Sequence, residues 1–160
     1  MTLITINPTD PLLAGRQSER ALAIRRGIQR MFFEQRWATL PELSLANGRR
    51  ADLIALGPKS EIVIIEIKSS VEDFKSDNKW SDYKPFCDQF YFATLSDVPA
   101  HIFPESEGFI VADKYGAEIL RTSQIDKIAA GTRKSIVQRF AASAADRLLA
   151  AEFSATNDKL

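Results

Sequence analysis

Apolar residues recur at helical spacing near both ends of the chain. Over 17–37 they form one stripe of Ala21, Ile24, Ile28, Met31 and Phe32. Repeats of three and four residues predict an amphipathic helix packed on a flat surface. A second helix is expected over 132–153, with Ile136, Phe140, Leu148 and Leu149 as its anchors. Residues 1–15 have no comparable period and are expected to form an irregular lead-in.

Between the two helices, short apolar runs separated by turn residues predict a sheet. Strands are expected over 39–45, 50–56, 62–68, 89–95, 109–112 and 118–121. Asn47-Gly48 is a strong hairpin signal, and Gly57-Pro58 begins the next turn. A polar and aromatic stretch over 71–86 is expected to hold a helix broken by Pro85. This order predicts an α/β fold in which a mixed β-sheet with an antiparallel meander is flanked by helices. One domain over 16–153 is expected, followed by a tail over 154–160.

Composition narrows the class of protein. The chain has 160 residues, of which 45% are hydrophobic and 26% charged, as in a soluble globular protein with one ordinary core. No apolar run is long enough to span a bilayer, and the first residues lack the basic start and cleavage site of a signal peptide. We therefore expect a cytoplasmic protein without a membrane partner.

Two residue types that often build functional sites are nearly missing from the sequence. Cys87 is the single cysteine and His101 the single histidine. An internal disulfide, a cysteine-built zinc site and a histidine-rich metal cluster are therefore excluded. If the chain is an enzyme, its chemistry rests on carboxylates, lysines and hydroxyls.

The net charge is zero, which argues against a strong, sequence-independent nucleic-acid binder. The charges are unevenly spread, however. The stretch 16–36 carries six arginines against two glutamates, and a second basic cluster lies over 133–147. Such clusters are more often solvated helix faces than binding surfaces.

The stretch EIVIIEIKSS over 61–70 ends an apolar strand with two charged residues, Glu66 and Lys68. Ionised groups in such a place are costly unless they are paired or hold a metal. If this strand pairs with the preceding one as an antiparallel hairpin, matching the apolar residues sets Leu56 opposite Ile62 and Asp52 opposite Glu66. Opposed side chains have Cβ atoms roughly 5 Å apart, and Lys68 projects from the same face as Glu66. Strand periodicity therefore predicts a charged cluster at one edge of the sheet.

The Asp52 and Glu66 carboxylates would repel each other across the hairpin. A divalent cation such as Mg²⁺ would turn that repulsion into binding energy. Alternatively, Lys68, Arg49 or Arg50 neutralises the pair as a structural ion network. The charges follow the apolar strand instead of interrupting it, which favours a site at the end of the sheet. A register shift of one residue would move Asp52 to the other face.

The residues Ala51-Asp52 and Glu66-Ile67-Lys68 resemble the motif of the PD-(D/E)xK nuclease superfamily. The longer text ELSLANGRRADLIALGPKSEIVIIEIKSSVEDFKSDNKWSDYKPFCDQFYFA, with GFIVADKYGAEILR after it, is similar to the MmcB-like family of bacterial DNA repair proteins. The likeness covers nearly the whole chain. It implies a restriction-endonuclease-like fold, a role in DNA repair and an active site of Asp52, Glu66 and Lys68. Ala51 stands where the motif has proline, a position that shapes the entry of the strand.

The resemblance also implies roles for the site residues. Asp52 and Glu66, helped by the backbone carbonyl of Ile67, would hold one or two Mg²⁺ ions, with Mn²⁺ as an alternative. Lys68 would position or deprotonate the attacking water and offset charge on the phosphate, unless it only forms a salt bridge to Glu66.

Many relatives carry a further acid, for which the sequence offers two candidates. Glu19 points to solvent by helical spacing. Glu42 faces the site only if the hairpin loop allows it, because a two-residue Asn47-Gly48 turn sets Leu43 opposite Asp52 instead.

Several polar and aromatic residues near this cluster are candidate DNA contacts. They are Arg49, Arg50, Ser69, Lys79, Trp80 and Gln89. Each has a structural alternative. The arginines can be ordinary hairpin residues, Ser69 and Ser70 can cap the next helix, Trp80 can pack on the sheet, and Gln89 can end a loop.

The resulting hypothesis is a metal-dependent DNA nuclease acting in DNA repair, either monomeric or homodimeric. A catalytically silent nuclease-fold protein that binds DNA or other repair proteins is the alternative, and an α/β domain with a purely structural charge cluster is a third.

Overall fold

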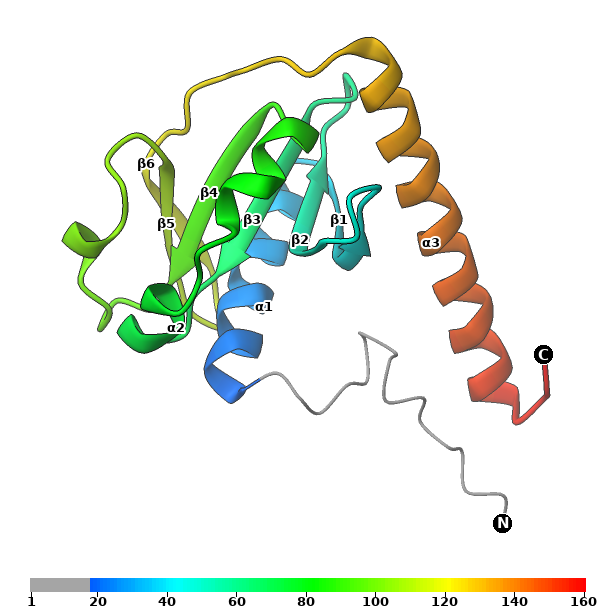
Figure 1. Ribbon diagram of the computed structural model, residues 1–160. Helices are drawn as coiled ribbons and strands as arrows, with labels where there is room; N and C mark the ends of the chain where they lie inside the picture. Colours follow the sequence, from blue (N-terminus) through cyan, green and yellow to red (C-terminus); the bar gives the residue numbers. More distant parts are fainter. Residues whose placement is uncertain (1–17) are drawn as a thin grey trace.

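Residues 18–160 are described by the computed structural model, in which a six-stranded sheet is flanked by helices (Figure 1). The expected lead-in, 1–15, lies outside the described residues. The elements in chain order are α1 (Glu19–Glu34), β1 (Ala38–Ser44), β2 (Arg50–Leu56), β3 (Ile62–Ile67), α2 (Val71–Lys75), the 3₁₀ helix η1 (Trp80–Phe86), β4 (Gln89–Thr94), the 3₁₀ helix η2 (Ala100–Ile102), β5 (Gly108–Ala112), β6 (Ala117–Arg121) and α3 (Ala130–Thr156).

The sheet has the strand order of the sequence, β1 to β6. The first three strands pair antiparallel, β3–β4 and β4–β5 pair parallel, and β5–β6 is again antiparallel. The predicted mixed sheet with an antiparallel meander is therefore confirmed. The parallel central strands need cover on both faces, and every residue of β3 is buried.

One face of the sheet is covered by α1, which runs behind the strands in Figure 1. Its stripe of Ile24, Ile28 and Phe32 packs on alternate residues of the central strands, including Ile65 and Tyr91. Ser18 caps the helix by accepting a hydrogen bond from the Ala21 amide. The predicted amphipathic helix is confirmed within a few residues at each end.

The opposite face is covered by aromatic residues and by the first half of α3. Phe92 of β4 contacts Phe74, Trp80 and Phe103 with ring centroids 5.3–5.4 Å apart. Ile136 and Phe140 of α3 are buried in the same cluster. This second core surrounds the end of β3 at which the charged residues lie.

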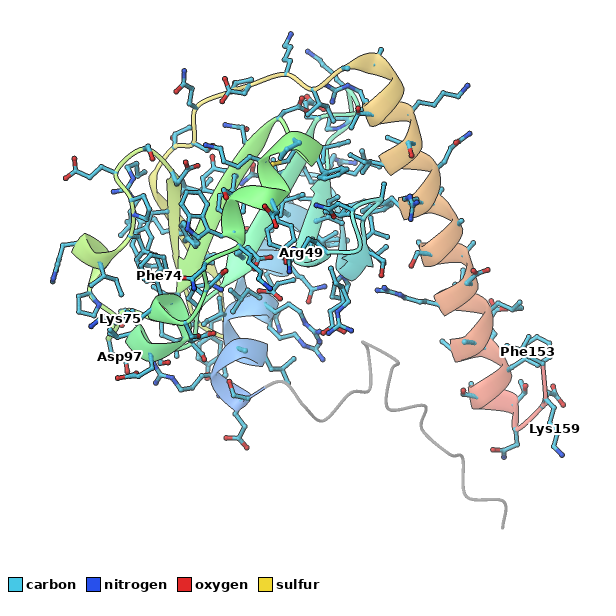
Figure 2. The ribbon with its side chains drawn as sticks, viewed as in Figure 1. Arg49, Phe74, Lys75, Asp97, Phe153 and Lys159 are labelled. Atoms are coloured by element: carbon cyan, nitrogen blue, oxygen red, sulfur yellow. The ribbon has the colours of Figure 1, made fainter. Side chains whose placement is uncertain are left out.

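The expected anchors Leu148 and Leu149 of α3 are wrong, because these side chains are 63% and 42% exposed. The buried residues of this helix, Ile136 and Phe140, both belong to its first half. Arg147 still binds backbone carbonyls of β1, and beyond it the helix extends away from the sheet, with Phe153 and Lys159 at the far end (Figure 2).

The stretch 71–86 also differs from the single broken helix that its sequence predicts. It forms the short helix α2 and, after a turn, the 3₁₀ helix η1, which contains Pro85. The Asp77 side chain accepts a hydrogen bond from the Lys79 amide at 2.8 Å. A side chain that binds nearby backbone in this way competes with helix continuation and ends α2.

Candidate active site

The pairing of β2 with β3 has the predicted register, with Leu56 opposite Ile62. The ladder ends at Leu53 and Ile65, one step before the two acids. Beyond that step, the backbone amides of the two strands donate to carboxylate oxygens instead of backbone carbonyls. Asp52 Oδ2 accepts from the Ile67 amide at 2.8 Å, and Glu66 Oε1 accepts from the Asp52 amide at 3.2 Å. The two strands are therefore joined at their ends by crossed side chains.

Burial makes this acid pair unfavourable in its doubly ionised form. Glu66 is 4% exposed, and Asp52 is half-buried. Desolvation raises the pKa of both carboxyls, and the charge of Asp52 raises that of Glu66 further. The Ile67 amide and the Lys68 ammonium oppose the effect on Asp52 without cancelling it. Without another cation, the pair therefore retains a proton at pH values where ordinary carboxyls have lost theirs.

Lys68 lies beside this pair and is 5% exposed. Its Nζ is 3.9 Å from Glu66 Oε2 but 2.6 Å from Oδ2 of Asp77. Burial alone would lower the pKa of Lys68, but the hydrogen bond that it donates to Asp77 and the charges of Glu66, Asp77 and Asp52 raise it overall. Lys68 therefore carries a positive charge, and its ammonium is paired with Asp77 more closely than with Glu66.

The Asp77 contact was missed in the sequence analysis. Asp77 lies just after α2, in Ser76-Asp77-Asn78, a run of turn-forming residues that signals a loop but not its direction. Only the short length of α2 brings this loop back to the end of β3.

Glu42 is the further acid that the structure brings to the site. The hairpin loop has three residues, Ala46 to Gly48, because Leu45 rather than Ala46 pairs with Arg49. Gly48 adopts the left-handed conformation that such loops require. Leu43 consequently pairs with Ala51, and Glu42 lies level with Asp52. The two-residue turn considered from the sequence is wrong, and its consequence, Leu43 at this level, is wrong with it.

Backbone geometry at Glu42 is itself unusual. Its φ is +52°, a region that costs non-glycine residues about 1–3 kcal/mol. Arg147 of α3 binds its carbonyl at 3.1 Å, and Arg50 lies 3.7 Å from its carboxylate. The Glu42 charge raises the pKa of Asp52. Glu19, the other candidate acid, is exposed in the first turn of α1.

The start of α2 forms one wall of the site. Ser70 caps the helix by accepting from the Asp73 amide at 3.0 Å. Asp73 in turn accepts from both the amide and the hydroxyl of Ser69, and Arg20 of α1 binds the Ser69 carbonyl. Capping is therefore the role of Ser70, while Ser69 is held by its neighbours at the edge of the site.

The structure separates the other candidate DNA contacts. Lys79 is exposed next to Asp77, whereas Trp80 stacks on Phe90 with ring centroids 5.7 Å apart and belongs to the core. Arg50 is exposed. Arg49, which is labelled in Figure 2, is bound to Asp82 at 3.0 Å. Both arginines remain near the site, because Arg50 begins β2 two residues before Asp52 and Arg49 directly precedes it.

Gln89 is not at the site, which corrects the prediction. It pairs with Val63 at the start of β4, whereas the site lies near Ala93, the partner of Ile67. Since β4 is parallel to β3, its first residue lies at the opposite edge of the sheet. There the Gln89 amide donates to the carbonyl of Ser123 at 2.9 Å.

Thr94, at the end of β4, was not singled out by the sequence. It follows Ala93, whose carbonyl accepts from the Lys68 amide, and by alternation it shares the face of Phe92 and Glu66. Its side chain is fully buried, and its hydroxyl has no hydrogen-bond partner among the residues described. A buried, unpaired hydroxyl next to charged residues is uncommon enough to need a reason.

The donor set matches a hard divalent cation better than a softer one. Asp52 and Glu66 each use one carboxylate oxygen for a backbone amide and keep a second. Across residues 18–160, no three acidic, histidine or cysteine side chains converge on one point. Two carboxylates with the remaining positions filled by water are what Mg²⁺ accepts in proteins.

The fold and the site define an α/β protein whose buried acids and lysine meet at one end of the central strands. A family model described as DNA repair protein MmcB-like matches residues 8–155, so the chain belongs to the MmcB-like family. A role in DNA repair follows from that membership at the level of the family. No helix within 18–160 has the length and apolarity needed to cross a bilayer.

A solved structure supports the fold. The SPO1766 protein of unknown function from Silicibacter pomeroyi is 38% identical, with a TM-score of 0.82, and the match covers 85% of this chain and 93% of that one. None of the curated proteins searched matches the chain.

Proposed function

We propose that this protein is a metal-dependent DNA nuclease of the PD-(D/E)xK type that acts in DNA repair. The observation that carries the proposal is the pair of half-buried Asp52 and buried Glu66 with Lys68 beside it. A structural ion network would match each charge, whereas here two acids retain raised pKa values despite a nearby lysine. Unfavourable acid pairs of this kind are characteristic of functional sites.

Asp52 and Glu66 would hold the cation through their second carboxylate oxygens, with Glu42 adding negative charge at the same level. Mg²⁺ or Mn²⁺, when bound, supplies a Lewis acid for the phosphate and lowers the pKa of a water. Ile67, whose amide donates to Asp52, would add its carbonyl oxygen as a further ligand.

Lys68 would face the phosphate group whose charge grows during attack by water. Its ammonium is held in place by Asp77, so it does not have to be ordered when DNA arrives. Hydrolysis adds water to the phosphorus and breaks one phosphorus–oxygen bond, leaving a phosphate and a hydroxyl end. The exposed Lys79 and Arg50 side chains, with the half-buried Ser69, would contact the DNA backbone around this point.

A DNA-binding protein of the same fold that does not cut is the second candidate. It is favoured by one specific observation: the Lys68 ammonium lies 1.3 Å nearer to Asp77 than to Glu66, from distances of 2.6 and 3.9 Å. A lysine committed to a structural partner would not assist hydrolysis.

Cleavage of a panel of DNAs would decide between the two. Single-stranded, duplex, flap, branched and lesion-bearing DNAs are incubated with Mg²⁺ or Mn²⁺, using the parent, Glu66→Gln and, as a matched control, Glu118→Gln on the exposed strand β6. We expect Glu66→Gln to lower cleavage by at least about a hundredfold, because the metal contributes several kcal/mol to the barrier. The control should cut like the parent.

Equal cleavage by the parent and Glu66→Gln would show a contaminant or another site. Binding without cleavage by all three proteins would establish the silent DNA-binding protein instead.

A further inference from the structure

A second surface, on the outer side of α1, is not used by the site at β3. Arg26, Arg30 and Phe33 follow one another at spacings of four and three residues, so they lie on one stripe. This stripe is opposite Ile24, Ile28 and Phe32, the buried face of the helix. Phe33 is 80% exposed, the most exposed large apolar side chain among residues 18–160.

The stripe borders a groove of about 480 Å³ where α1 turns into β1. Its lining consists of Arg26, Gln29, Arg30, Phe33, Trp37, Ala38 and Thr39. Among residues 18–160, the groove is therefore lined by two guanidiniums and two aromatic rings and by no acidic side chain. The backbone carbonyl of Lys114 accepts from Arg30 Nε at 3.2 Å, which holds that guanidinium beside the groove.

The exposed Phe33 ring and the half-buried Trp37 ring, which packs on Phe32, are interleaved with arginines, and this combination fits one class of ligand best. Unpaired bases stack on aromatic rings regardless of sequence, and guanidiniums bind the phosphates between them. Paired bases in a duplex have no free face to offer. We propose that the Arg26–Arg30–Phe33–Trp37 groove binds single-stranded DNA.

The groove and the acid site lie at opposite ends of α1. Arg20, in the first turn, contacts the Ser69 carbonyl at the acid site, and Phe33 is thirteen residues further on, which is about 20 Å along the helix. Two exposed acids belong to α1. Glu19 lies about 10 Å before Arg26, and Glu34 follows Phe33 but does not line the groove. The groove is thus a separate contact. The proposal takes its DNA partner from the proposed function but does not require cleavage.

Binding titrations in EDTA test the groove without any cutting. Fluorescence polarisation with oligo(dT) and with a duplex of equal length compares the parent, Phe33→Ala, Phe33→Tyr and the double variant Arg26→Gln, Arg30→Gln. We expect Phe33→Ala to weaken single-strand binding at least about fivefold, with little change for the duplex, and Phe33→Tyr to bind like the parent.

The double arginine variant should also lower the salt dependence of single-strand binding, by about 1.4 in the slope of log K against log salt. Lys134→Gln, Arg139→Gln is the matched control, since it removes two exposed charges from α3 and leaves the groove intact. Parental binding by Phe33→Ala, or equal losses from the control, would overturn the proposal.

Tryptophan fluorescence gives an independent readout. The chain has two tryptophans, so Trp80→Phe leaves Trp37 as the reporter. Oligo(dT) should quench it, and unchanged emission at a saturating concentration would contradict a base in the groove. If DNA is cut but Phe33→Ala binds normally, the groove proposal fails alone. If Phe33 matters but nothing is cut, the nuclease proposal fails alone.

Discussion

Carboxylates lie at both ends of the central strands, but their hydrogen-bond partners differ between the two ends. At the start of β4, Asp88 accepts from the amides of Ile62 and Ile128 and is paired with both terminal nitrogens of Arg133 at 2.6 and 2.7 Å. At the other end, Asp52 and Glu66 face each other with one amide each.

The electrostatic outcome differs accordingly. Burial would raise the pKa of Asp88, but the hydrogen bonds from Arg133 and from the two amides lower it overall. Burial raises the pKa of Asp52 and Glu66, and their partners do not reverse it. The first arrangement stabilises the fold, since Asp88 ties the stretch after β6 and the start of α3 to the sheet. The second arrangement costs stability, and this cost is the basis of the proposed metal site.

The largest expected effect on stability concerns the end at which Asp88 is paired with Arg133. Arg133→Met leaves Asp88 buried without its counter-charge, and the carbonyl of Ser60 loses a hydrogen bond as well. We expect the free energy of unfolding to fall by about 3 kcal/mol, measured by urea denaturation. Arg133→Lys keeps the charge but not the bidentate contact, so its free energy of unfolding should lie between those of the parent and Arg133→Met. An unchanged free energy would show that the pair does not hold α3 to the sheet.

The next effect concerns the end with Asp52 and Glu66, where a substitution is expected to raise the free energy of unfolding. The raised pKa values mean that the folded, metal-free protein binds protons more tightly than the unfolded chain. Its stability is therefore full below the ordinary carboxyl range near pH 4 and decreases as the pH rises through the higher folded values. In EDTA at pH 8, Glu66→Gln should be more stable than the parent by about 2 kcal/mol. Asp88→Asn is the contrast, because its lowered pKa gives stability that is lost as the pH falls.

Thermal unfolding from pH 5 to 8.5 would show this difference. A parent and a Glu66→Gln variant with parallel pH profiles would mean that the acid pair carries no cost.

The smallest effect compares two hydroxyls at the ends of β4. The Ser123 hydroxyl accepts from the Phe90 amide at 3.0 Å, so Ser123→Ala should cost about 1 kcal/mol. Thr94 has no such bond, and Thr94→Val should be neutral or stabilise by up to about 1 kcal/mol. Chemical denaturation of both variants, with cleavage assayed in parallel, measures this. A loss of stability in Thr94→Val would show that its hydroxyl does have a partner, such as a water.

The sequence predicted the sheet and the acid pair because both follow from short-range periodicity. Apolar alternation in two adjacent strands is enough to set Leu56 opposite Ile62, and the position of Asp52 follows by counting. The resemblance to the family, based on the same residues, is confirmed over residues 8–155.

The features that the sequence did not predict depend on loop geometry or on distant parts of the chain. Asp77 reaches Lys68 only because α2 has five residues. Gln89 was misplaced because strand direction, and not strand content, decides which edge a residue occupies. Leu148 and Leu149 fit the helical period, but the period cannot show where the sheet beneath α3 ends.

The hairpin between β1 and β2 shows how a surface loop can determine the composition of a buried site. Its three residues place Glu42, and not Leu43, at the level of Asp52. Shortening the loop by one residue would exchange an acid for an aliphatic side chain there without altering either residue. A one-residue gap in an alignment of relatives, usually dismissed as loop variation, would mark in this hairpin a change in the charge of the site.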